Sequence, residues 1–383
     1  MSFELNKEII DYIENSVDEA RELLKQLCLI PAPSNHEEKR AEFCKNWLES
    51  IGAEGVYIDS ALNVVYPVNC GGRDDITVFM AHTDTVFPDM TEPMPYSEDE
   101  KNIYSPGVGD DTVCLVMMLM TVKYIIEKGI KPGCGMLFVA NSGEEGLGNL
   151  KGSRKIMEDY AGRVKEFYTF DGQYNRVVNA CVGSHRYKIT LETEGGHSFS
   201  KFGNNNAIHL MSRLICSLYS CQVPKVRNSK TTYNVGVIEG GTSVNTIAQK
   251  CQLMYEYRSD NKECMDIMQK FFEAEIAKVK EEGKATVTVE LVGERPCGGD
   301  VDMDKLNEMT ERCIKITEKY TGNECLAVSG STDCNIPQSL GVPAICPGTY
   351  MGGGAHTRGE WVEKSSIPVG MKIVFELILN FFN

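Results

Sequence analysis

Residues 76–84 read ITVFMAHTD, a short apolar run that ends in a histidine and an aspartate. Such a run is typical of a buried strand that leads into a loop. Residues 134–145 (CGMLFVANSGEE) and 164–172 (VKEFYTFDG) repeat the pattern and also end in polar residues, while residues 114–129 (CLVMMLMTVKYIIEKG) predict a helix. The alternation predicts an α/β domain with a mixed, largely parallel sheet sandwiched by helices. In such sheets ligands bind beyond the carboxyl ends of the strands.

The pattern changes at about residue 182. Residues 182–293 predict the order strand, helix, strand, strand, helix, strand, which is typical of a compact two-layer α+β domain. After Glu294 the first pattern resumes and includes a further buried strand, VPAICPG. We therefore predict an α/β domain formed by residues 1–181 and 294–383, interrupted by an inserted domain at 182–293. A length of 383 residues also favours more than one hydrophobic core.

The composition excludes several classes of protein. A hydrophobic fraction of 42% and a charged fraction of 24% are ordinary for a soluble globular chain, and no apolar run is long enough to span a bilayer. The net charge of −15 argues against nucleic acid or an anionic membrane as partner. The fifteen cysteines are odd in number and form no Cys-x-x-Cys pair. With no signal-peptide pattern at the start, we expect reduced thiols and a cytoplasmic location.

Histidine and acidic residues follow the predicted strands. His82 can bind a metal, and Asp84 can accept the proton of the other ring nitrogen, although a solvated loop pair is an equally simple reading. In SPGVGDDT (105–112), Asp110 and Asp111 can cap a helix. Alternatively, Asp110 binds a metal, and Asp111 either supports the metal ligands or caps the following helix. The glycines beside Asp110 and Asp111 would allow the backbone to approach a metal closely.

A second acidic pair lies in NSGEEGLGNLKGS (141–153). Glu144 and Glu145 repel each other unless cations or protons compensate, although a surface loop would also tolerate them. One of them can bind a metal while the other acts on a metal-bound water. Asp171 follows the third strand, and His356 lies in the glycine-rich stretch GTYMGGGAHTRGEWV (348–362).

Together these residues supply five candidate ligands for a pair of divalent ions that share one bridging ligand. Two ions at about 3.5–4 Å separation can hold a hydroxide nucleophile and polarise a carbonyl oxygen. The candidate ligands are His82, Asp110, Glu145, Asp171 and His356.

Eight short motifs occur in the order HTD, GDD, GEEG, FDG, GGHSF, GGTSVN, YEYRSD and GGGAHT. In this order, over essentially the whole chain, the sequence resembles the co-catalytic zinc metallopeptidases that include peptidase T, carboxypeptidase G and the aminoacylases. The resemblance implies two zinc ions per chain, for which cobalt or manganese could substitute. It implies these roles: Asp110 shared by both ions, His82 and Asp171 completing one site, Glu145 and His356 completing the other, Asp84 orienting His82, and Glu144 acting as general base.

The inserted domain would be a lid that also forms a homodimer. By the resemblance, His197 in EGGHSFS stabilises the oxyanion, with Asn245 of GGTSVN nearby. Arg258 in YRSD has a planar donor fork suited to a substrate carboxylate. Taken singly, each of the three is as well explained as a turn or surface residue. The chain departs from the family at Thr112, where many members carry a lysine, and this puts only the local surroundings of the metals in question.

The expected reaction is hydrolysis of an amide bond in a small peptide by a zinc-bridging hydroxide. A tripeptide aminopeptidase is the first choice, because the GVGDDT and GEEGLGNLKG stretches look closest to the peptidase T branch. An N-acyl-amino-acid deacylase or a carboxypeptidase could use the same centre. An inactive zinc-binding scaffold is less favoured, because Glu144 and all five ligands are present.

Overall fold

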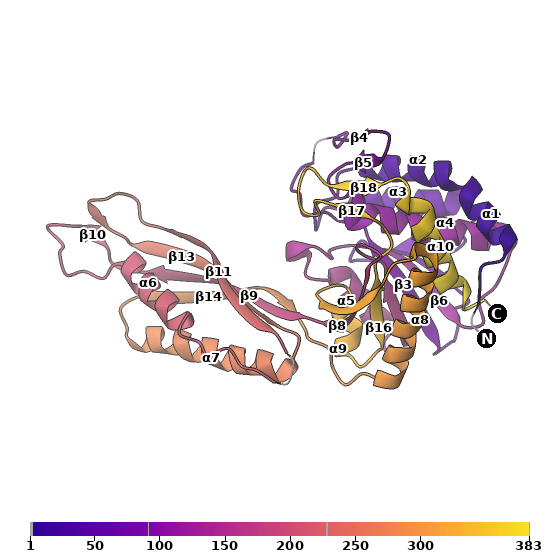
Figure 1. The fold of residues 1–383 in the computed structure, drawn as a ribbon. Coiled ribbons are helices and arrows are strands. Elements are labelled where there is room, and N and C mark those ends of the chain that lie inside the picture. The colour runs from indigo at the N-terminus through magenta and orange to yellow at the C-terminus, as the bar shows by residue number, and fades with distance from the viewer. Residues whose placement is uncertain (1–2, 91, 227–228, 383) are drawn as a thin grey trace. The chain divides into compact units, whose positions relative to one another are not determined.

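The chain forms two compact units in the computed structural model, which describes residues 3–90, 92–226 and 229–382 (Figure 1). One unit comprises Met1–Cys181 and Asp300–Asn383, and the other comprises Val182–Gly299. The second unit extends past residue 293 because its last strand, β14 (Thr286–Arg295), pairs with β9 (Gly183–Glu192) as far as Arg295.

An eight-stranded mixed sheet forms the centre of the first unit. Its middle strands pair in parallel, and antiparallel pairs occur toward its edges. In spatial order the strands are β1 (Tyr57–Ile58), β2 (Val64–Val68), β6 (Gly135–Asn141), β3 (Ile76–His82), β7 (Val164–Thr169), β16 (Ala344–Pro347), β8 (Arg176–Cys181) and β15 (Leu326–Gly330). The predicted α/β fold class with a mixed, largely parallel sheet is confirmed.

Helices cover both faces of this sheet. Strand β3 is buried along its whole length because alternate side chains enter two cores: Phe79 packs into one core and Val78 and Met80 into the other. The core around Phe79 is closed by α1 (Lys7–Asn15), α2 (Val17–Cys28), α3 (Glu38–Ser50), α4 (Val113–Lys128), α8 (Met303–Thr321) and α10 (Ser366–Leu379). The opposite core is closed by α5 (Lys151–Asp159) and α9 (Asn335–Ser339).

Three parallel strands deliver polar residues to one edge of the sheet. His82 is the last residue of β3 and pairs with Asn141, the last residue of β6. Strand β7 ends at Thr169, two residues before Asp171. A small sheet, β17 (Gly352–Gly353), β18 (Trp361–Glu363), β5 (Asn102–Tyr104) and β4 (Ser97–Glu98), joins the C-terminal hairpin to the segment that precedes residues 105–112.

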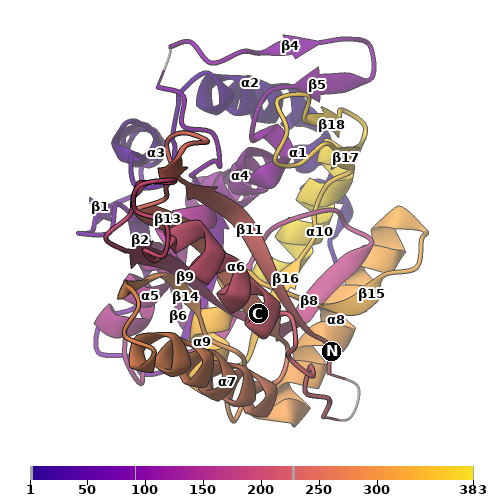
Figure 2. The same cartoon turned by 90° about the vertical axis from the view of Figure 1, so that its left-hand side faces the viewer.

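The second unit has two layers (Figure 2). Strands β11 (Thr231–Gly240), β13 (Lys250–Ser259), β9 and β14 form an antiparallel sheet, and α6 (Ala207–Leu218) and α7 (Lys262–Glu281) pack against one face of it. A separate pair of short strands, β10 (Gly196–His197) and β12 (Thr246–Ile247), carries two of the sequence motifs.

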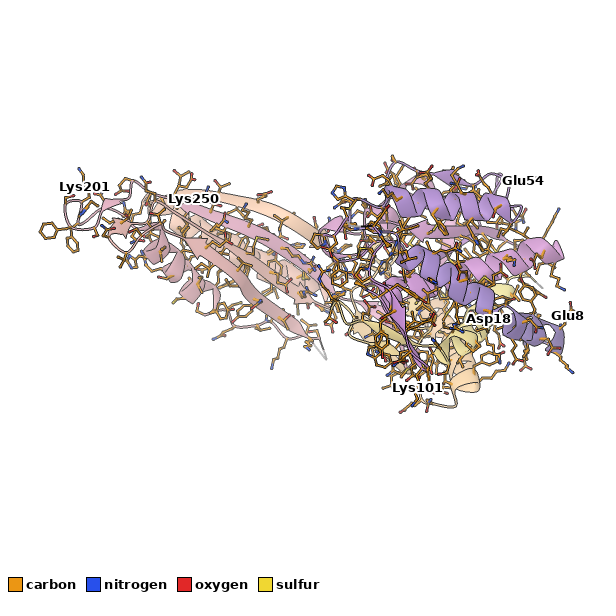
Figure 3. The ribbon with its side chains drawn as sticks, turned by 90° about the horizontal axis from the view of Figure 1, so that it is seen from above. Glu8, Asp18, Glu54, Lys101, Lys201 and Lys250 are labelled. Atoms are coloured by element: carbon orange, nitrogen blue, oxygen red, sulfur yellow. The ribbon has the colours of Figure 1, made fainter. Side chains whose placement is uncertain are left out.

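Charged side chains lie on the outside of both units. Glu8, Asp18, Glu54 and Lys101 project from the first unit, and Lys201 and Lys250 are exposed on the second (Figure 3). Within the described part of the chain, no helix combines the length and the apolarity that crossing a bilayer requires.

Candidate metal centre

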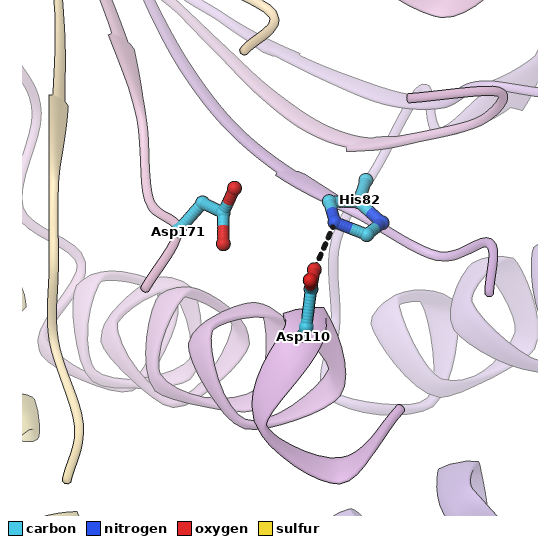
Figure 4. A group of neighbouring side chains, drawn as sticks. All are labelled: His82, Asp110 and Asp171. Atoms are coloured by element: carbon cyan, nitrogen blue, oxygen red, sulfur yellow. Dashed lines mark hydrogen bonds and ion pairs between the residues drawn. The ribbon is translucent and has the colours of Figure 1, made fainter. Parts of the chain in front are cut away.

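His82 is held from three sides at the end of β3. Its side chain is 1% exposed, and its backbone N–H donates to Asp111 Oδ2 at 2.9 Å. Its Nδ1 lies 3.1 Å from the carbonyl oxygen of Asp84, and its Nε2 lies 3.0 Å from Asp110 Oδ1 (Figure 4). If Nδ1 donates to that carbonyl, Nε2 presents a lone pair toward Asp110 and is ready to bind a metal.

Asp110 lies between the two predicted histidines. His356 Nε2 is 3.2 Å from Asp110 Oδ2 and 2.9 Å from Glu145 Oε1. The backbone of His356 has φ 63°, a left-handed conformation that non-glycine residues rarely adopt and that is frequent at functional sites. The glycine-rich loop thus turns His356 back toward the carboxylates.

The five predicted ligands form two groups of three that share Asp110. Ligand atoms of His82, Asp110 and Asp171 lie within 4.8 Å of one another, and so do those of Asp110, Glu145 and His356. Figure 4 shows Asp171 facing the pair formed by His82 and Asp110. Imidazole nitrogens and carboxylate oxygens are ligands that zinc and similar divalent ions accept, so the residues present fit two such ions.

Burial and neighbouring charges perturb the protonation of these groups. Burial alone lowers the pKa of His82, but hydrogen bonds to Asp110 and Asp84 outweigh it and raise this pKa well above its usual value. Hydrogen bonds to Asp110 and Glu145 raise the pKa of His356 to about 11. Burial raises the pKa of Glu145 to about 7, and burial together with Asp110 raises that of Asp171. Protons and divalent cations therefore compete for the same donor atoms.

Asp84 organises the acidic pair in the neighbouring loop. It is fully buried, and its Oδ1 and Oδ2 accept the backbone N–H groups of Glu144 and Glu145, each at 3.0 Å. Its Oδ1 also lies 3.4 Å from His82 Nδ1. The ring of His82 therefore lies closer to the carbonyl oxygen of Asp84 than to its carboxylate. The carboxylate of Asp84 mainly fixes the loop that carries Glu144.

Glu144 is 6% exposed and lies beside the ligands. One oxygen of Glu144 is within 4.8 Å of ligand atoms of His82 and Glu145. The geometry therefore allows a second reading in which Glu144 binds a metal.

The side chains of Asp111 and Thr112 form hydrogen bonds with backbone groups close to Asp110. The carboxylate of Asp111 accepts from His82 N, whereas the first turn of α4 has no side-chain cap. Of the two roles predicted for Asp111, support of the site therefore fits the structure. Thr112 Oγ1 donates to the carbonyl of Gly107 at 2.6 Å, which closes the loop that carries Asp110.

Sequence reasoning missed two residues that hold this loop and its neighbour. Glu360 is 1% exposed, and its carboxylate accepts the backbone N–H groups of Gly107, Gly109 and Asp110 at 2.7, 2.9 and 2.7 Å. Ser34 donates to Asp84 Oδ2 at 2.7 Å. For Glu360 a signal existed, since it lies four residues after His356 in a stretch already singled out.

The loop at residues 329–335 also reaches this edge of the sheet. Asp333 is fully buried, and its Oδ2 accepts from Asn141 Nδ2 at 2.7 Å. Burial and the charge of Glu144 raise the pKa of Asp333 to about 8. The loop therefore contributes a buried carboxyl group beside the acidic pair rather than an ordinary surface turn.

The remaining predicted site residues belong to the second unit. His197 lies on β10, and the backbone N–H of Ser198 donates to the carbonyl of Asn245 at 2.9 Å, so these two motifs are neighbours. His197 is exposed, and its Nδ1 accepts from the N–H groups of Phe199 and Ser200 at 3.3 and 3.4 Å. Arg258 is paired with Glu256 through two hydrogen bonds of 3.0 Å.

The fold and the cluster of carboxylates and histidines at the sheet edge define a metal-dependent hydrolase. The chain belongs to peptidase family M20/M25/M40, because the profile of that family matches residues 78–380. It is therefore a hydrolase that acts on peptide or amide bonds.

Curated relatives share a low level of identity with the chain. A peptidase M20 domain-containing protein from Schizosaccharomyces pombe is 24% identical over an alignment of 269 positions, which covers 67% of this chain and 65% of that protein. An acetylornithine deacetylase from Proteus mirabilis is 23% identical over an alignment of 389 positions, which covers 94% of this chain and 96% of that protein.

Solved structures share the fold over nearly the full length. A tripeptidase from Staphylococcus aureus has a TM-score of 0.74 and 23% identity, with 94% of this chain and 97% of that chain covered. A Bacillus subtilis protein described as a dinuclear metal binding peptidase of the M20 family has a TM-score of 0.67 and 12% identity, with 96% and 99% covered. The predicted family is thus confirmed, and the peptidase T branch stays a prediction.

Proposed function

We propose that this chain is a di-zinc aminopeptidase that releases the amino-terminal residue of tripeptides. The observation that carries the proposal is the division of the site: two of the three groups of candidate ligands share Asp110 and contain all five predicted ligands. The proposal assigns Glu144, which lies with His82 and Glu145 in the third group, to proton transfer. This arrangement supplies metal ligands and a separate acid–base residue in one place.

Two bound zinc ions would polarise the substrate carbonyl and lower the pKa of water. Glu144 takes a proton from the attacking water and returns it to the leaving amine. Asp84 keeps this base in position, because its carboxylate accepts the backbone N–H of Glu144. The buried surroundings of Asp84 strengthen that hydrogen bond.

His197, Asn245 and Arg258 are proposed to act on the substrate. Because Nδ1 of His197 accepts two backbone N–H groups, its Nε2 carries the proton and can donate to a developing oxyanion. The side-chain oxygen of Asn245 accepts from Ser243 Oγ at 2.6 Å, which leaves its amide N–H₂ as the donor. Arg258 would bind a substrate carboxylate, which would take the place of Glu256 at the guanidinium.

Two observations favour different substrates. The resemblance of GVGDDT and GEEGLGNLKG to the peptidase T branch, together with the similarity to a tripeptidase, supports a tripeptide. The similarity to an acetylornithine deacetylase over 94% of the chain supports an N-acyl amino acid as the second candidate.

Free and blocked substrates separate these candidates. We expect unblocked tripeptides to release their first residue, and acetyl-blocked tripeptides to have a kcat/KM lower by at least about 10²-fold, because a site that binds an amine rejects an analogue without it. Product identification by mass spectrometry measures both. Faster hydrolysis of N-acetylornithine than of any tripeptide would establish the deacylase, and release of the last residue would establish a carboxypeptidase.

Metal removal tests whether the centre is catalytic. We expect dialysis against a chelator to abolish hydrolysis, and zinc to restore it. At a free zinc concentration of about 100 times Kd, removal of each ion costs roughly 2.7 kcal/mol, which lowers Tm by about 3 °C per ion for a chain of this size. Calorimetry and metal analysis follow both effects. Two zinc ions per chain without hydrolysis of any peptide would indicate the inactive scaffold, and another metal in protein purified from cells would exclude zinc.

A homodimer and a cytoplasmic location complete the proposal. Strand β11 is an edge strand that exposes Val237 (47%) and Ile238 (50%), and such an edge can pair with a second copy. The fifteen cysteines are present as thiols, which suits a reducing compartment. A monomeric mass in light scattering would refute the homodimer. Recovery of the protein outside the cytoplasm on cell fractionation would refute the cytoplasmic location.

A further inference from the structure

Two fully buried polar side chains at the start of α3, and a partly buried one just before it, face the loops of the metal centre. Ser34, Glu37 and Arg40 are spaced three residues apart. Ser34 donates to Asp84, as described above, and Glu37 forms an ion pair of 2.8 Å with Lys151. None of the three is itself a candidate metal ligand in the described groups.

Arg40 makes the most direct link between two of these loops. Its side chain is among the largest that are fully buried, with 1% exposure. Its Nη1 donates to the carbonyl oxygen of Thr83 at 2.8 Å and to Thr112 Oγ1 at 3.2 Å. Its Nε donates to the carbonyl of Ile30 at 2.9 Å, which anchors the guanidinium to the chain that precedes α3.

The two threonines are placed next to the candidate ligands. Thr83 follows His82 directly, and Thr112 lies two residues after Asp110. One guanidinium nitrogen therefore connects the end of β3 to the start of α4. Since His82 Nε2 and Asp110 Oδ1 lie only 3.0 Å apart, a small shift of either loop changes the distance between two ligand atoms.

The charge of Arg40 is also unusual for its surroundings. The three acceptors named above are neutral oxygens, and a buried cation is costly unless negative charge compensates it. Burial lowers the pKa of Arg40, and the charge of Asp84 is among the influences that raise it. A rigid fork with several donors suits this position, whereas a lysine would supply a point charge and hold fewer of the acceptors.

We propose that Arg40 is a positioning residue that sets the spacing of His82 and Asp110 for metal binding, with Thr112 as its acceptor beside Asp110. This inference rests on the proposed metal centre, and zinc binding by the unaltered protein tests that centre separately. If the unaltered protein bound no zinc, the proposed function would fail before Arg40 is considered.

The test is zinc titration of the full-length, metal-free protein, with Kd measured by competition against a chromogenic chelator. We expect Arg40→Met to raise Kd by about 10–100-fold, the range found when groups that orient ligands are removed. Arg40→Lys should raise it less, because the charge remains. A wild-type Kd in Arg40→Met would overturn the proposal, even if Tm fell, since a merely structural role moves Tm alone.

Arg163 provides a matched control in the same unit. It also donates to backbone carbonyls, those of Arg73 and Cys70, and it directly precedes β7, at the amino end of that strand. We expect Arg163→Met to leave the zinc Kd unchanged. An equal rise in Kd for Arg163→Met would overturn the proposal, because it would show a general effect of losing an arginine that donates to backbone carbonyls.

Thr112 supplies a second route if Arg40→Met does not fold. Thr112→Val removes the hydroxyl that accepts from Arg40 and donates to the carbonyl of Gly107, and it keeps the shape of the side chain, whereas Thr112→Ser keeps the hydroxyl. We expect Thr112→Val to raise the zinc Kd and Thr112→Ser to retain the wild-type value. If Thr112→Val and Arg40→Lys both bound zinc with wild-type Kd, the proposal would be wrong.

Discussion

Replacement of Glu144 with glutamine is expected to lower kcat by about 10²–10⁴-fold and to leave the metal content unchanged, because glutamine has the same size but cannot accept the proton. The backbone N–H of residue 144 still donates to Asp84, so the loop keeps its position. Steady-state kinetics on a tripeptide and metal analysis of the same preparation measure the two quantities.

Glu376→Gln is the control for this change. Glu376 is also a buried glutamate (3% exposed), but its partners on α8 are Lys319 and Tyr320. We expect this variant to keep kcat within about threefold, since the residue contacts no candidate ligand. Wild-type kcat in Glu144→Gln would exclude Glu144 as the base. Loss of zinc from that variant would instead make Glu144 a ligand, the second reading of its position beside His82 and Glu145.

The sequence predicted the parts of the site that follow from local order along the chain. His82, Glu145 and Asp171 each follow a short apolar run, and parallel strands bring the carboxyl ends of such runs to one edge of a sheet. Because this rule depends only on strand direction, the three loops could be placed together before the tertiary contacts were known. The fold class could be predicted for the same reason.

Long-range support could not be predicted in this way. Glu360 contacts the backbone of Gly107 and Asp110, which lie about 250 positions earlier in the chain, and no local pattern specifies that contact. Arg40 is equally hidden, since a buried arginine within a charged helix start has the composition of a solvated surface. These contacts depend on how the C-terminal hairpin and α3 pack, which the spacing of residues does not encode.

The role of Asp84 shows a third limit, which concerns atoms rather than positions. The spacing His-x-Asp predicts a contact between His82 and Asp84, and the two residues do meet. The spacing does not say whether the carbonyl or the carboxylate faces the ring. In the structure the carboxylate is used by two N–H groups of the next loop, so only the packed loops decide which oxygen is left for the imidazole.

Asp110→Asn is expected to have the second large effect, a loss of metal affinity by about 10²-fold or more together with loss of turnover. Removal of an orienting group already costs 10–100-fold, and Asp110 is common to both groups of ligands. An amide keeps the size of the side chain but removes its charge and one acceptor oxygen. The two oxygens that now face His82 and His356 would become one oxygen and one N–H₂ group.

Asp111→Asn separates this effect from a general loss of acidity in the loop. Asp111 has the same side chain at the neighbouring position, but its Oδ2 accepts a backbone N–H from His82, which an amide oxygen can also accept. We therefore expect Asp111→Asn to bind two zinc ions and Asp110→Asn to bind fewer, as measured by isothermal titration. Equal zinc stoichiometry and Kd in both variants would show that Asp110 is not shared between the ions. Greater loss in Asp111→Asn would reverse the roles of the two aspartates, because the buried carboxylate would then be the one that the metals require.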